Sequence, residues 1–112
     1  MVKIIQEDYT VGASTSGGSV INFDQAINGR LPRVKKISCI SAQTLGKQFL
    51  TLKHKNSDVV VVDDVDLYFL TSNYDEKFTP EAPGGSYIYS IRNADTSEKT
   101  VSLVFELEYL EF

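Results

Sequence analysis

Hydrophobic and polar residues alternate along several short stretches of this chain, which is the pattern of β-strands that bury one face. The clearest stretch is Thr100–Phe112. From Val101 to Tyr109 every odd-numbered residue is apolar, whereas the even-numbered residues are polar except Val104. A period of two over about ten residues predicts a half-buried antiparallel strand.

The same kind of pattern predicts eight short strands in all. They are Val2–Val11, Ser19–Phe23, Arg33–Ala42, Gln48–Lys55, Val59–Val62, Val65–Thr71, Ser86–Asn93 and Thr100–Phe112. Asp63 and Asp64 separate the fifth predicted strand from the sixth, and we expect a turn or bulge there. In the sixth strand, we expect Val65, Leu67 and Phe69 to share one face.

The segments between the strands carry turn and loop signals. Gly12–Gly18 consists of small residues typical of a flexible loop, and Asn73–Gly85 contains two prolines and two glycines. Asp24–Pro32 holds Asn28-Gly29, a turn signal, and allows one helical turn capped by Asp24. No window shows a helical stripe of ten residues or more.

These elements predict an all-β protein with one domain over residues 1–112. A chain of 112 residues is the length of one typical domain. About eight short strands with turns between them indicate a single antiparallel β-sandwich or barrel. We favour a jelly roll, although seven to nine strands of an immunoglobulin-like sandwich would give almost the same pattern.

Charge is distributed unevenly along the sequence. The net charge is −4, but residues 1–56 carry eight cations against three acids and residues 57–112 carry three cations against twelve acids. The two halves therefore have net charges of +5 and −9. One interpretation is a surface with a basic and an acidic side that packs against copies of itself. The other is interleaving, with strands of both halves lying side by side. The acidic balance argues against free nucleic acid as a partner.

One short segment concentrates the basic residues, namely Arg30, Arg33, Lys35 and Lys36. Three roles are open for it: guarding a strand edge against wrong pairing, contacting an acidic neighbouring subunit, or contacting phosphates. Tyr74 and Phe78 in the long loop are amphipathic or apolar groups suited to protein or sugar contacts. Together these six residues are the candidate interface with another subunit or partner.

The sequence contains few groups that carry catalysis. His54 is the single histidine and Cys39 the single cysteine, which excludes an intrachain disulfide and a two-histidine metal site within one chain. By alternation His54 falls on the face of Leu50 and Leu52, and Cys39 lies in a strand as a small apolar residue. We therefore expect no enzymatic activity, no catalytic residues and no cofactor.

A group of acids raises the question of a cation site. Asp58, Asp63, Asp64 and Asp66 lie close together in the sequence. The spacing of the helix–loop–helix calcium motif is absent. We expect no metal site here, although the sequence does not decide whether this group binds a cation.

The N-terminal residues and the hydropathy pattern bear on localisation. Charged residues arrive too early for a signal peptide, and no run approaches the roughly 18 apolar residues of a membrane span. We expect a protein made in the cytosol that stays cytoplasmic or, if viral, enters a virion.

The order of strands and loops resembles the small single jelly-roll proteins of viral capsids and vertices. The resemblance rests on the eight short β segments, the long loop Asn73–Gly85 and the alternating strand Val101–Tyr109. It implies a non-enzymatic virion building block that self-associates through loops and charged patches, often as a pentamer, or contacts other virion proteins. No functional position is carried over from this family. The alternative is a β-sandwich module that binds protein or carbohydrate near Tyr74, Phe78 and the strand that contains Tyr87 and Tyr89.

Overall fold

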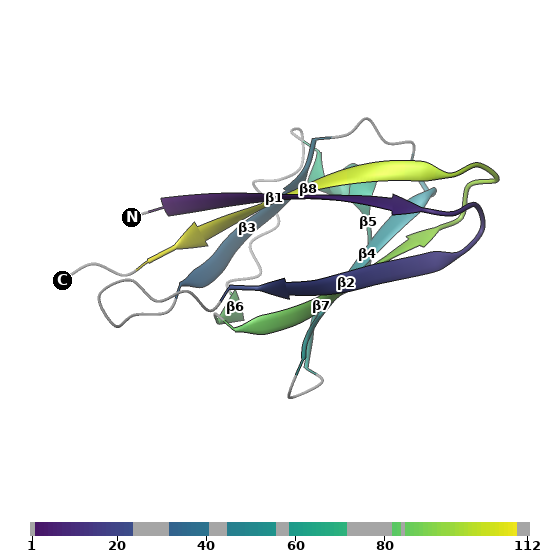
Figure 1. Ribbon diagram of the computed structural model, residues 1–112. Coiled ribbons are helices and arrows are strands. Elements are labelled where there is room, and N and C mark those ends of the chain that lie inside the picture. Colours follow the sequence, from purple (N-terminus) through teal and green to yellow (C-terminus); the bar gives the residue numbers. More distant parts are fainter. Residues whose placement is uncertain are drawn as a thin grey trace.

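Two antiparallel β-sheets packed face to face form the structure (Figure 1). The computed structural model describes residues 2–23, 32–40, 45–55, 59–71, 82–83 and 85–109. Within them lie β1 Val2–Val11, β2 Ser16–Asn22, β3 Arg33–Cys39, β4 Gln48–His54, β5 Val60–Asp66, the 3₁₀ helix η1 Leu67–Leu70, β6 Ala82–Pro83, β7 Ser86–Asn93 and β8 Lys99–Glu108. β6 has only two residues, whereas each of the other seven strands has at least seven. The all-β sandwich predicted from the sequence is confirmed.

The chain alternates between the two sheets at every connection except the one from β4 to β5, which lie in the same sheet. One sheet has the strand order β1-β8-β3-β6 and the other β2-β7-β4-β5, and these are called sheet A and sheet B below. The pairs therefore join the first strand with the last, the second with the seventh, the third with the sixth and the fourth with the fifth. In Figure 1, β1 and β8 lie side by side in one layer, and β2 and β7 lie side by side in the other.

Apolar side chains from both sheets meet between the two layers. Phe23, directly after β2, packs its ring 5.2 Å from that of Phe105 in sheet A and 5.6 Å from that of Tyr87 in sheet B, measured between centroids. All three side chains are buried. The inner residues of β8, from Val101 to Leu107 in steps of two, are buried together with Tyr109 directly after the strand, so the face assignment predicted from the alternation is confirmed.

The region after β4 differs from the sequence-based prediction of two strands broken at Asp63-Asp64. A single strand, β5, runs through both aspartates, with a bulge in which Asp63 and Asp64 stand against Thr51. Asp64 has a φ of 49° there, and its N–H donates to Thr51 Oγ1 over 3.1 Å. The expected bulge is confirmed, but the expected interruption between two strands is wrong, because a bulge absorbs an extra residue without ending the pairing.

The predicted strand Val65–Thr71 is also wrong beyond Asp66. The chain turns into η1 because Asp66 caps it, its Oδ1 accepting a hydrogen bond of 3.0 Å from the Tyr68 N–H. In a 3₁₀ helix positions three apart lie on the same side, so Leu67 and Leu70 are buried. Phe69 is 45% exposed rather than sharing a face with Leu67.

Smaller differences concern strand ends and the long loop. β2 begins at Ser16, three residues before the predicted strand, and β3 ends at Cys39 instead of Ala42. Two residues of the predicted loop, Ala82 and Pro83, pair with β3 as β6. The helical turn expected over Asp24–Pro32 lies outside the described residues except at its final position.

Asn93 organises the end of the sandwich where the β1–β2 and β7–β8 connections meet, at the right of Figure 1. Its side chain is buried, accepts hydrogen bonds from Gln48 Nε2 and the Asp95 N–H, and donates to the carbonyls of Gly12 and Ser97. Buried amides require such partners, so this network fixes the geometry of both connections.

Candidate interaction surfaces

The basic segment of the sequence lies against acidic residues of the neighbouring strand. β3 pairs with β8, which places Arg33 opposite Glu108 and Lys36 opposite Glu106. Lys35 Nζ lies 2.8 Å from Glu108 Oε2. This ion pair, together with the charge of Arg33, holds the pKa of Glu108 below its ordinary value. Of the six candidate interface residues, the structure therefore brings Arg33, Lys35 and Lys36 together on sheet A.

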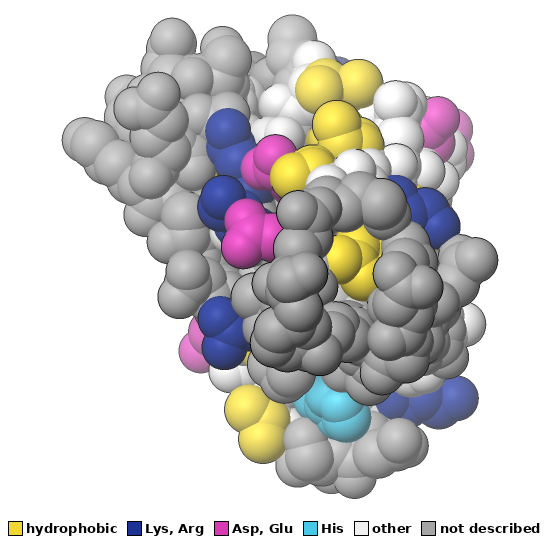
Figure 2. All heavy atoms as spheres, turned by 90° about the vertical axis from the view of Figure 1, so that its left-hand side faces the viewer, with side chains coloured by type: hydrophobic (Ala, Val, Ile, Leu, Met, Phe, Trp, Pro, Cys, Tyr) yellow, Lys and Arg dark blue, Asp and Glu magenta, His cyan; other side chains and the backbone are white. Residues whose placement is uncertain are grey.

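The other three candidate interface residues, Arg30, Tyr74 and Phe78, lie outside the described residues. The pairing of β3 with β8 supports one of the two interpretations of the charge distribution. Strands from the basic and the acidic half of the sequence lie side by side, so interleaving accounts for part of the asymmetry. Figure 2, in which the left-hand side of Figure 1 faces the viewer, shows basic and acidic side chains next to one another.

The outer face of sheet A continues from this charged group to two exposed apolar residues. Val2 and Ile4 of β1 pair with Glu108 and Glu106, so they share the outer face with these two glutamates. Val2 is 50% exposed and Ile4 is 65% exposed. Apolar side chains beside charged ones of both signs form a surface typical of protein–protein contacts.

The outer face of sheet B carries an ordered ion pair. The Arg92 guanidinium on β7 donates to both carboxylate oxygens of Asp64, Nε over 3.0 Å and Nη2 over 2.8 Å. The guanidinium carbon lies 4.0 Å from the centroid of the Phe49 ring on β4. This pairing lowers the pKa of Asp64, with the Arg92 hydrogen bonds as the main cause. The group joins three strands across the sheet surface.

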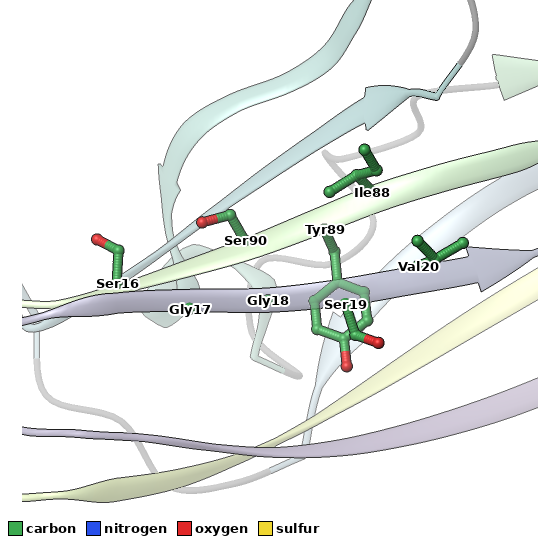
Figure 3. A pocket seen from close by; sticks show the side chains of 8 residues that line it. All are labelled: Ser16, Gly17, Gly18, Ser19, Val20, Ile88, Tyr89 and Ser90. Atoms are coloured by element: carbon green, nitrogen blue, oxygen red, sulfur yellow. The ribbon is translucent and has the colours of Figure 1, made fainter.

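A shallow hollow of about 370 Å³ is lined by residues of the paired strands β2 and β7. Its outer side is formed by Ser16, Val20, Ile88 and Ser90, whose side chains point away from those of Ser19 and Tyr89 (Figure 3). Gly18 has no space for a Cβ because the Tyr89 carbonyl oxygen occupies it. The lining carries no charged side chain, so the hollow offers little to orient a small polar ligand.

The acids that suggested a cation site are engaged separately. Asp66 accepts from the Gly46 N–H over 2.7 Å as well as from Tyr68, so its carboxylate holds the loop before β4 and η1. Asp64 is paired with Arg92, Asp63 is exposed, and Asp58 lies outside the described residues. Among the described residues, no three His, Cys, Asp or Glu side chains lie together in a way that could hold a metal ion.

The single histidine and the single cysteine belong to different sheets. Cys39 is buried in β3 of sheet A, as expected of a small apolar residue. His54 ends β4 in sheet B, and its ring contacts the buried Tyr87 edge-on with 5.2 Å between centroids. It therefore lies on the face of Leu50 and Leu52 as predicted. Its Nδ1 is buried and has no hydrogen-bond partner among the residues that the structure describes.

Sequence reasoning missed two features of these surfaces. Arg92, Phe49 and Asp64 are far apart in the sequence and come together only through strand pairing. Nothing in a local pattern specifies that pairing. The apolar exposure of Val2 and Ile4 gave no clear signal, because both faces of β1 mix apolar and polar residues.

No protein family, curated protein or solved structure matches this chain. In the part of the chain that the structure describes, no helix is both long and apolar enough to cross a lipid bilayer.

Proposed function

We propose that this protein is a non-enzymatic assembly subunit with a jelly-roll fold, acting through contacts with copies of itself as a component of a virion. The observation that carries self-association is the outer face of sheet A. There Val2 and Ile4 are exposed next to a group with charges of both signs, formed by Arg33, Lys35, Lys36, Glu106 and Glu108.

The strand order supports the jelly-roll topology. A jelly roll has eight strands in two sheets, built from two Greek keys. In the immunoglobulin arrangement the first two strands belong to the same sheet. Here β1 and β2 lie in different sheets, and the strands pair from the outside of the chain inward. The virion assignment rests on the family resemblance of this strand and loop order, which makes it an analogy of fold.

The absence of catalysis in this proposal is supported by the placement of the reactive side chains. Nucleophilic catalysis requires a base within hydrogen-bond reach of the nucleophile. Cys39 is buried in sheet A and His54 lies at the end of a strand in sheet B.

The alternative of a carbohydrate-binding module finds less support among the described residues. Sugar binding uses aromatic rings that are accessible to the ligand. The rings of Tyr87 and Tyr89 are buried between the sheets. The Phe49 ring on the outer face of sheet B is covered by the Arg92 guanidinium.

The solution mass tests the proposed function. A single chain has a mass of 12.5 kDa. Light scattering at rising protein concentration is expected to give a multiple of this mass, which decreases at high salt because the charged group is screened. A mass of five chains would support the ring that the family resemblance implies. A mass of one chain at every concentration and in every salt would contradict self-association.

A further inference from the structure

The two sheets have four edges, and these edges differ in how well they could pair with another strand. β6 has two residues and includes Pro83. β5 is bulged and carries the exposed acids Asp63 and Asp64. β2 begins Ser16-Gly17-Gly18-Ser19, which has low β propensity. Short length, proline, bulges and charges are the usual means by which proteins protect sheet edges.

β1 lacks most of these protections. All ten of its residues pair with β8 in one unbroken register, and no described residue pairs with its other side. On the outer face Val2 and Ile4 are exposed. On the inner face Ile5 and Tyr9 pack against the core but are only partly buried. A strand added beside β1 would cover more of the Ile5 side chain.

We propose that β1 of one copy pairs antiparallel with β1 of a second copy and so joins two A sheets into one sheet across a two-fold axis. This inference rests on the proposed function of self-association and names its contact. An isologous contact of this kind uses the same strand twice, and it closes after two copies.

The sequence of β1 selects one register for this contact. Residues directly opposite each other in an antiparallel pair lie on the same face of the sheet, so inner residues must meet inner residues. The register centred on Ile5 places Lys3 of each copy opposite Glu7 of the other, and Ile5 opposite Ile5. Opposite charges in facing positions stabilise a strand pair. The axis thus lies between two matched ion pairs.

The neighbouring registers lack this match. Centring the contact on Ile4 places Lys3 opposite Ile5, and centring it on Gln6 places Glu7 opposite Ile5. Centring it on Glu7 places the two glutamates opposite each other, which is destabilising. The opposing interpretation is that Lys3 and Glu7 protect the edge, because inward-pointing charges discourage pairing. These two interpretations differ in a charge-exchange experiment, because an exchanged charge still points inward and edge protection therefore predicts no change in association.

The experiment compares the association of the wild type with Lys3→Glu, Glu7→Lys and the double variant, by sedimentation equilibrium at low salt. Each single variant places like charges opposite each other in the dimer, so we expect its dimer dissociation constant to rise at least about tenfold. The double variant restores opposite charges in exchanged positions and is expected to form dimers again. Mixing the two single variants is expected to give a dimer with one copy of each.

Asp63→Lys on β5 is the matched control, since it changes the net charge as Glu7→Lys does but lies at the edge of the other sheet. It is expected to associate like the wild type. Thermal unfolding of every variant checks that the fold is retained. The Lys3→Glu variant tests the charge pairing without removing the Glu7 carboxylate that accepts a hydrogen bond from the Tyr89 hydroxyl.

The outcomes separate the two proposals. A wild-type oligomer whose mass does not respond to the exchanges, or a five-chain mass, overturns the β1 contact and leaves self-association standing. A wild-type monomer at every concentration overturns both. Single variants that associate more strongly than the wild type would also overturn the contact, because the proposed ion pairs predict weaker association.

Discussion

Phe105 is a residue whose contacts span the whole thickness of the sandwich. It is fully buried in β8 and its ring packs against Phe23, which itself contacts Tyr87 of the other sheet. We expect Phe105→Ala to lower the free energy of unfolding by about 3–5 kcal/mol, because it removes apolar contacts and leaves a cavity. Denaturant unfolding measures this change. Phe69→Ala is the matched control, since Phe69 is 45% exposed, and it should cost about half as much or less. Equal costs would contradict the assigned inner face.

Tyr89 gives a prediction for alkaline pH. Burial, and then the nearby Glu7 carboxylate, raise the pKa of its phenol from 10.0 to about 12. In the unfolded chain the phenol ionises near its ordinary value, so the folded state holds a proton that the unfolded state loses. The stability that depends on this group is present below about pH 10 and is lost as the pH rises towards 12.

The pH dependence of unfolding tests this prediction. Stability measured between pH 9 and pH 12 should fall less steeply in Tyr89→Phe than in the wild type. Part of the fall should remain, because burial also raises the pKa of Tyr87. Identical slopes for both proteins would show that the Tyr89 phenol is not held in its neutral form.

At the scale of elements, β2 depends on two glycines that a strand would ordinarily avoid. A Cβ on Gly17 would meet the Tyr9 hydroxyl, and a Cβ on Gly18 would meet the Tyr89 carbonyl oxygen. We expect Gly18→Ala to destabilise the fold by about 1–3 kcal/mol, since the backbone of β2 must shift away from β7. Ser19→Ala on the same strand is the control and should change stability by less than about 0.5 kcal/mol. A neutral Gly18→Ala would contradict the close approach of the two strands.

Local patterns predicted the strands that bury one face, and they failed where tertiary contacts decide. β7 and the inner face of β8 follow directly from alternating residues. β5 and η1 do not, because Thr51 on another strand accommodates the bulge and Asp66 turns the chain into a 3₁₀ helix. β6 is a strand only because two residues of a proline-containing loop meet β3. Its pairing partner lies about fifty residues away, beyond the reach of any local signal.

The candidate surfaces also combine features that local patterns predict with features that only the strand pairing determines. The basic segment on β3 was visible in the sequence, but the glutamates that face it belong to β8 and were identified only by the sheet order. The acids around Asp64 looked like one group, yet Asp64 and Asp66 hold different partners. Asp64 faces Arg92 on β7, whereas Asp66 at the end of β5 accepts hydrogen bonds from the backbone of Gly46 and Tyr68, so closeness in sequence does not gather their carboxylates into one site.

At the scale of the whole molecule, the fold interleaves the two halves of the sequence. Each pair β1·β8, β2·β7 and β3·β6 brings a strand from the basic half beside one from the acidic half. The charge asymmetry of the sequence is therefore spread over both sheets. The contacts that we propose with another copy are local, namely the outer face of sheet A and the edge of β1.

The solution mass of the wild-type protein tests the central claim of self-association most directly. Light scattering over a wide range of concentrations at low salt should give a mass above the 12.5 kDa of one chain, rising by mass action, and twice that mass if β1 pairs with β1. A mass of 12.5 kDa throughout the range would contradict the account.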